Sequence, residues 1–152
     1  MALRLPGYSS LDPHTAINAL SVFVNTSPIN EGKKRFTISL AGEYDAGVTR
    51  RFIEKTVSSE KVVVFSWTVC PFARKAKQLL TDLGADFFAV ELNQREDGKA
   101  IRAELAKMTN RTSVPNVFIA GTSYGGCNDG PGIATLHSQG KLVSLLQQAG
   151  AL

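Results

Sequence analysis

Cysteine and histidine are scarce in this chain of 152 residues, and their scarcity excludes two classes of protein. The two cysteines, Cys70 and Cys127, are too few for the disulfide framework of a small secreted domain. Together with only two histidines, they do not make a structural zinc site. We therefore expect a reducing compartment, the cytoplasm, in which both cysteines are thiols available for reaction.

Long hydrophobic runs and a strong net charge are also lacking. No run of eighteen apolar residues occurs, so we expect no membrane-spanning segment and no membrane partner. The formal charge of +4 is too small to indicate nucleic-acid binding, and the basic residues form no long cluster. The charge does suit a small anionic ligand, because a basic pocket rim raises the local concentration of anions.

From residue 45 onward, the hydrophobic pattern predicts an alternation of helices and strands around one core. A strand–helix–strand unit favours a parallel pair of strands, and a late hairpin around Gly121 adds antiparallel strands. The helix at 45–58 is expected to turn Val48, Phe52, Ile53 and Val57 inward. The expected elements are helix 45–58, strand 61–66, helix 71–83, strand 86–92, helix 97–109, strands 116–120 and 122–125, and a closing helical region over 136–149 that Gly140 interrupts.

Residues 1–44 form an N-terminal extension of unknown role in this interpretation, in front of a domain over 45–152. Residues 15–24 are apolar and suit either a helix or a strand, whereas the alternation in 35–40 predicts an edge strand. The extension has few acidic residues and several serines and threonines. A plastid or mitochondrial targeting role and an unstructured extension both remain open.

Cys70 lies between the end of a predicted strand and the start of a predicted helix. Pro71 suits the first helical position, because its ring fixes a helical backbone angle and it lacks an N–H that would be unpaired there. The sulfur of Cys70 would then face free backbone N–H groups and the positive end of the helix dipole. These favour the thiolate, which is the nucleophilic form of cysteine. Cys70 is therefore the candidate nucleophile.

Three motifs in a fixed order carry a resemblance to a known family. Residues 70–73, Cys-Pro-Phe-Ala, resemble the active-site motif Cys-Pro-Tyr-Cys or its monothiol variants. Residues 112–119 resemble a Thr-Val-Pro segment, and residues 125–129 resemble a Gly-Gly-Cys-Ser-Asp turn. On these residues the chain resembles the glutaredoxins over 45–152. The resemblance implies a thioredoxin-like α/β fold, with a four-stranded mixed β-sheet flanked by helices.

The resemblance also implies a role for each matching residue. Pro115 would be the family's cis-proline facing Cys70, and the backbone of Val114 would pair with bound glutathione. Asn128 and Asp129 would receive the γ-glutamyl end, and Arg102 would bind the glycine carboxylate. A solvated helix charge is the alternative interpretation of Arg102. The residues expected to bind glutathione are Trp67, Phe72, Arg102, Ser113, Val114, Pro115, Gly126, Cys127, Asn128 and Asp129.

Three departures from the family pattern restrict the chemistry. Ala73 replaces the second cysteine of the dithiol motif, so no local thiol can resolve a disulfide at Cys70. Trp67 stands where the family usually has a lysine that supports the thiolate and binds a glutathione carboxylate. Residues 130–132 lengthen the loop after Asp129. Cys127 is interpreted as a bystander, with a secondary disulfide or a bound glutathione as the alternatives.

Three functions fit these residues. The leading hypothesis is a monomeric oxidoreductase that reduces protein–glutathione mixed disulfides or small disulfides through Cys70 alone, with glutathione as the reductant. The second is a carrier in which Cys70 and glutathione bridge a [2Fe–2S] cluster between two subunits, although Pro71 stiffens the loop where cluster carriers have glycine. The third is a glutathione-binding module with little activity. The presence of Trp67 in place of the family's lysine would favour this function.

Overall fold

The computed structural model describes residues 28–152, so the apolar segment 15–24 lies outside the described residues. The elements are α2 (Pro28–Ala41), α3 (Ala46–Ser59), β1 (Val62–Ser66), α4 (Pro71–Asp82), β2 (Phe88–Glu91), the short 3₁₀ helix η2 (Leu92–Gln94), α5 (Gly98–Thr109), β3 (Asn116–Ile119), β4 (Thr122–Ser123), α6 (Ile133–Ser138) and α7 (Leu142–Gln148).

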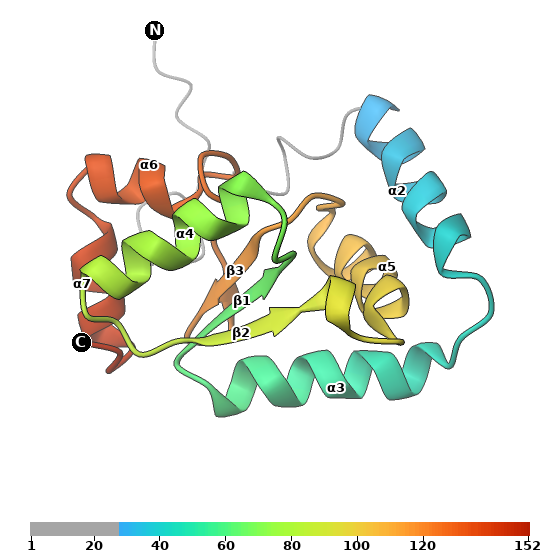
Figure 1. Cartoon of the computed structure of the whole chain (residues 1–152), viewed down its shortest axis with the longest axis horizontal. Helices are drawn as coiled ribbons and strands as arrows, with labels where there is room; N and C mark the ends of the chain where they lie inside the picture. Colours follow the sequence, from blue (N-terminus) through green and yellow to red (C-terminus); the bar gives the residue numbers. More distant parts are fainter. Residues whose placement is uncertain (1–27) are drawn as a thin grey trace, which may run out of the picture.

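The expected four-stranded mixed sheet is confirmed, with the strand order β2-β1-β3-β4 (Figure 1). Strand β1 is buried at every position and forms the centre of the sheet. It runs parallel to β2, with Val63 opposite Phe88, and antiparallel to β3, with Val64 opposite Val117. The expected hairpin is present as the antiparallel pair of β3 and β4.

Helices cover both faces of the sheet, because successive residues of a strand point to opposite sides. Val62 and Val64 of β1 pack in a cluster with residues of α4, α6 and α7. Val63 and Phe65 pack in a second cluster with residues of α3 and α5. The layers are visible in Figure 1, where α4, α6 and α7 lie together and α3 and α5 lie on the other side. No helix among residues 28–152 is long and apolar enough to cross a membrane.

The edge strand expected over 35–40 is wrong, because these residues lie inside helix α2. The less exposed positions of α2 include Asn30, Lys34, Thr37 and Ala41, which recur at helical spacing. Most of these side chains are polar or small, so the hydrophobic pattern did not mark them as an inward face. Gly42 follows with a φ of +66°, a left-handed conformation that suits glycine where a helix ends.

Helix α2 is part of the expected extension, yet it packs along α5. The side chains of Asn30 and Lys34 both donate hydrogen bonds to Asn110, which ends α5, at 2.8 and 2.9 Å. The division of the chain at residue 44 stays a prediction, but residues 28–41 contribute a helix to the packed structure. In α3, Ile53 is fully buried as expected, whereas the inward orientation expected for Val48 is wrong, since 55% of Val48 is exposed.

Candidate active site

Cys70 is the N-cap residue of α4, and Pro71 follows in the first turn, as the sequence predicted. The turn before the helix is closed by a hydrogen bond from the backbone N–H of Cys70 to the carbonyl of Trp67, at 3.1 Å. The thiol is half-buried and donates to the carbonyl of Val114, with 3.8 Å between Sγ and oxygen. The beginning of α4 and the segment before β3 therefore meet at the sulfur.

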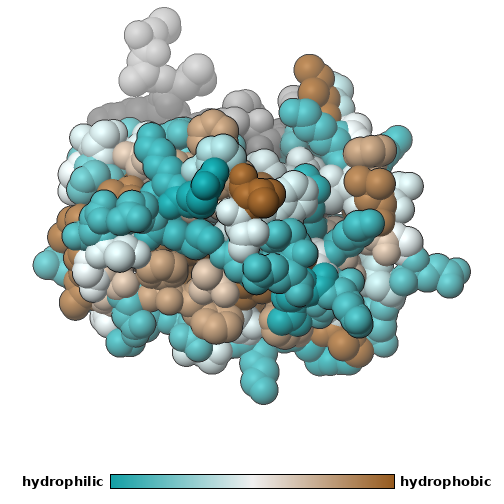
Figure 2. Space-filling view, viewed as in Figure 1, coloured by the Kyte–Doolittle hydropathy of each residue, from teal (hydrophilic) through white to brown (hydrophobic). Residues whose placement is uncertain are grey.

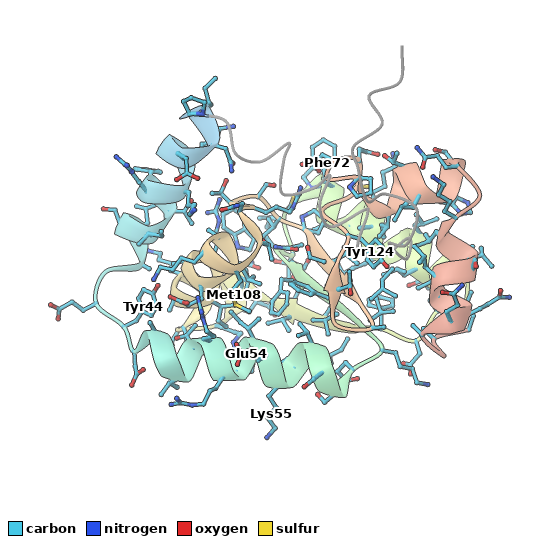
Figure 3. All side chains as sticks on the ribbon, turned by 180° about the vertical axis from the view of Figure 1, so that it is seen from behind. Tyr44, Glu54, Lys55, Phe72, Met108 and Tyr124 are labelled. Atoms are coloured by element: carbon cyan, nitrogen blue, oxygen red, sulfur yellow. The ribbon has the colours of Figure 1, made fainter. Side chains whose placement is uncertain are left out.

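The surface around Cys70 carries exposed apolar side chains. Val69 and Phe72 are 72% and 57% exposed. Figure 2 shows a small hydrophobic patch among hydrophilic atoms at this turn, and Figure 3 shows Phe72 at the outer edge of the molecule, at the start of α4. An exposed apolar rim beside a thiol suits contact with the carbon atoms of a disulfide substrate.

Seven of the ten residues expected to bind glutathione line one groove of about 350 Å³. Pro115, which follows a cis peptide bond as expected, lines this groove in the segment before β3, and the turn after β4 lines it too. We call it the thiol groove, since Cys70 contacts Val114 on its wall. The seven residues are Phe72, Ser113, Val114, Pro115, Cys127, Asn128 and Asp129.

Arg111 holds two sides of the thiol groove together, and the sequence analysis did not identify it. Its guanidinium is 3.1 Å from the Asp129 carboxylate and donates to the Ser113 hydroxyl, also at 3.1 Å. Arg111 is only 3% exposed, and its Nε has no hydrogen-bond partner. A Cβ at Gly126 would lie 2.7 Å from the guanidinium, so a side chain at this position would displace Arg111. Asp129 itself stays 69% exposed and open to a ligand.

Trp67 and Arg102 do not line the thiol groove but form a pair beside it. The guanidinium of Arg102 lies over the Trp67 ring, 4.7 Å from the ring centre. The Nε of Arg102 also donates to the carbonyl of Thr112 at 2.8 Å. Burial lowers the pKa of Arg102, which nevertheless stays cationic at any physiological pH. Trp67 therefore holds a cation next to the site, where the family's lysine would itself be the cation.

Cys127 lines the thiol groove, but it belongs to the apolar core rather than to the surface. It is 1% exposed and packs in the cluster that includes Val64 and Leu136. Burial raises the pKa of the Cys127 thiol, although the charge of Lys75 opposes this shift. Raised pKa and burial both reduce reactivity.

Asn93 fixes the turn that carries Cys70, and it too was missed in the sequence. Its side-chain oxygen accepts a hydrogen bond from the N–H of Thr68 at 3.0 Å, and its amide donates to the Thr68 hydroxyl at 2.7 Å. Among the basic residues of α4, Lys77 is paired with Glu91 of β2. Among residues 28–152, no group of three or more histidine, cysteine, aspartate or glutamate side chains is placed to hold a metal ion.

Comparison with known proteins now identifies the family. A family profile described as glutaredoxin matches residues 62–124. Glutaredoxin-C2 of Arabidopsis thaliana is 50% identical over 99 residues, which cover 65% of this chain and 86% of that protein. The chain belongs to the glutaredoxin family. A glutaredoxin from Vernicia fordii is 46% identical over 99 residues, covering 65% of this chain and 92% of its own.

Solved structures agree with the fold of this glutaredoxin. The crystal structure of a buckwheat glutaredoxin–glutathione complex matches with a TM-score of 0.67 and 39% sequence identity, over 70% of this chain and 94% of the buckwheat chain. The expected thioredoxin-like α/β fold is thereby confirmed. The residues matched by the family profile begin after both α2 and α3.

Proposed function

We propose that this glutaredoxin reduces mixed disulfides between proteins and glutathione through Cys70 alone. The observation that carries the proposal is the difference between the surroundings of the two cysteines. Cys70 is accessible at a helix start, whereas Cys127 is buried in the core. Ala73, where a dithiol enzyme has its second cysteine, is fully buried and offers no thiol. The absence of a second exposed thiol among residues 28–152 supports a monothiol mechanism.

The first step is attack by the Cys70 thiolate on the glutathione sulfur of the mixed disulfide. The bond between the two substrate sulfurs breaks, a disulfide forms between Cys70 and glutathione, and the protein thiolate leaves and takes a proton. In the second step, the thiolate of a free glutathione attacks the glutathione sulfur bound to Cys70. Cys70 leaves as a thiolate and glutathione disulfide is released, so that one glutathione is consumed as reductant.

The thiol groove is the proposed position of glutathione. Val114 lines the groove beside the sulfur, and a peptide backbone can pair with its backbone there as with a strand edge. Asp129 offers a carboxylate to the ammonium group of the γ-glutamyl end. Arg102 offers a guanidinium to the glycine carboxylate. The complex of the buckwheat relative with glutathione supports this partner.

A glutathionylated protein is the proposed substrate, the proposed enzyme is a monomer, and the proposed compartment is the cytoplasm. A plastid or mitochondrion is the alternative compartment, and one relative from Oryza sativa is named glutaredoxin-C4, chloroplastic. Expression of the full chain with a fluorescent protein at its C-terminus tests the compartment. Light scattering of the purified chain tests the oligomeric state.

The function is tested by reduction of a glutathionylated model peptide with glutathione, coupled to glutathione reductase. We expect turnover by the wild type and none by Cys70→Ser, while Cys127→Ser keeps its activity. Turnover that survives Cys70→Ser would overturn the proposal. A folded wild type that binds glutathione without turnover would instead indicate a binding module.

A further inference from the structure

Helix α2 carries an apolar stripe that is exposed to solvent. Ile29, Phe36 and Leu40 are 74%, 65% and 48% exposed. They are separated by seven and four residues, so they lie on one side of a helix with 3.6 residues per turn. At 1.5 Å per residue, the stripe is about 16 Å long. Figure 2 shows hydrophobic surface at the upper right, where Figure 1 draws α2.

Basic side chains accompany this apolar stripe. Lys33 lies four residues after Ile29, on the same side of the helix. Arg35 is exposed on the same helix. No carboxylate of the described residues pairs with Lys33 or Arg35, whereas Lys34 pairs with Glu31 at 3.4 Å. The uncompensated charge of α2 is therefore positive, and it lies beside exposed apolar side chains.

This combination of charge and apolar surface matches a membrane that contains anionic lipids. A helix in the interface inserts its apolar side chains at the boundary of the acyl chains, while its cations contact the anionic headgroups. A second copy of the chain fits less well, because pairing α2 with itself brings like charges together. Helix α2 lies at the edge of the molecule in Figure 1, where a flat surface can reach it.

We propose that α2 binds the surface of a membrane that contains anionic phospholipids. The apolar stripe of Ile29, Phe36 and Leu40 enters the interface, and Lys33 and Arg35 contact the headgroups. No membrane partner was expected from the sequence, because no segment spans a bilayer, but a helix in the interface needs no span. The contact does not involve the thiol groove, so this inference is independent of the proposed function.

Sedimentation of the full chain with lipid vesicles tests the proposal. One set of vesicles is phosphatidylcholine alone, and the other set also contains phosphatidylserine. We expect the chain to sediment with the second set and to stay in solution with the first, because the apolar stripe is short and needs the added attraction of the charges. Added salt should release the chain, since it screens the headgroup charges. The Cys70→Ser chain should bind as the wild type does.

Matched variants assign the binding to α2. Phe36→Ala should weaken it about fivefold or more through loss of apolar surface, whereas Phe88→Ala, at a residue of β2 that is 47% exposed, should not. Lys33→Gln should weaken it about fivefold, because one cation leaves the membrane surface. Lys55→Gln removes the same charge from α3, where Figure 3 shows the side chain projecting away from the molecule, and should leave binding unchanged.

The outcomes separate this inference from the proposed function. Absence of sedimentation with the phosphatidylserine vesicles overturns the proposal. Equal losses in Phe36→Ala and Phe88→Ala, or in Lys33→Gln and Lys55→Gln, overturn it as well, since the binding would then not belong to α2. A dimer in light scattering that Phe36→Ala dissociates would assign the stripe to a second copy instead and contradict the proposal. Vesicle binding without turnover of a glutathionylated peptide supports the membrane contact and contradicts only the proposed function.

Discussion

Cys127 lies in the same groove as the proposed glutathione site, yet its surroundings differ sharply from those of Cys70. The side chain is 1% exposed, and burial raises the pKa of its thiol. A thiol with a raised pKa holds less thiolate at neutral pH, and the thiolate is the form that reacts. Packing thus makes the cysteine that lines the groove less reactive than the cysteine beside it.

Alkylation should show this difference at the residue scale. In the Cys70→Ser chain, we expect iodoacetamide to modify Cys127 on the order of a hundredfold more slowly in the native state than in urea, because reaction requires opening of the core. In the Cys127→Ser chain, Cys70 should react readily without urea. Mass spectrometry at timed intervals measures both rates, and rapid native modification of Cys127 would contradict its assignment to the core.

Arg111 is a positioning residue for the thiol groove, because it pairs with Asp129 and binds the Ser113 hydroxyl from a buried position. In Arg111→Met, we expect the KM for glutathione to rise about fivefold with little change in kcat, as Asp129 loses its fixed orientation. Arg111→Lys should restore part of the affinity. Arg51→Met, on the exposed side of α3, is the control. Loss of kcat at unchanged KM would argue against positioning.

At the scale of elements, η2 and α5 approach so closely that one position requires glycine. A Cβ on Gly98 would lie 1.8 Å from the carbonyl oxygen of Leu92. Gly98→Ala should therefore lower the free energy of unfolding by about 2–3 kcal/mol through overpacking. Gly32→Ala in α2 is the matched control, since a Cβ there meets nothing within 4 Å. Urea unfolding of both variants measures the difference, and equal stabilities would show that the contact relaxes freely.

Elements with an apolar period were predicted well from the sequence, and elements with a polar inward face were not. Strand β1 was predicted because all its residues are buried between two helical layers, which selects a continuous apolar run. Helix α2 was missed because its inward positions include Asn30, Lys34 and Thr37. The closing helical region was predicted with its break at Gly140, which has a φ of +71° between α6 and α7.

The candidate site was predictable where it rests on local sequence, and less so where it rests on contacts across the fold. Cys70 was identified because a strand end, Pro71 and a helix pattern are adjacent in the chain. Arg111 was missed because a charged residue in a turn is usually solvated, whereas this one is buried by the segment that carries Asp129. The stacking of Arg102 on Trp67 joins residues 35 positions apart, and no local pattern indicates it.

At the scale of the whole molecule, a buried carboxylate ties the linker after α2 to α3 and α5. Glu104 is 1% exposed and accepts hydrogen bonds from Tyr44 at 2.7 Å and from Lys107 at 2.6 Å, with Arg50 3.4 Å away. Burial alone raises the pKa of Glu104, but these hydrogen bonds and charges outweigh it and hold the pKa below its usual range.

The lowered pKa predicts the pH dependence of stability. The stabilisation by Glu104 is present above its unfolded pKa, near 4.5, and is lost as the pH falls through the lower folded pKa. Glu104→Gln should lower the free energy of unfolding by about 1–3 kcal/mol at pH 7. The loss should become smaller as the pH falls below the unfolded pKa of Glu104. Glu54→Gln, at an exposed position of α3, is the control. A cost that is independent of pH would contradict the role of the charge.

The central claim is that one cysteine at the start of α4 performs the whole reaction. Turnover of a glutathionylated peptide by wild type, Cys70→Ser and Cys127→Ser, with glutathione and its reductase, tests it most directly. The account predicts that Cys70→Ser abolishes turnover and that Cys127→Ser retains most of it. Turnover by Cys70→Ser, or loss of turnover in a folded Cys127→Ser chain, would contradict the account.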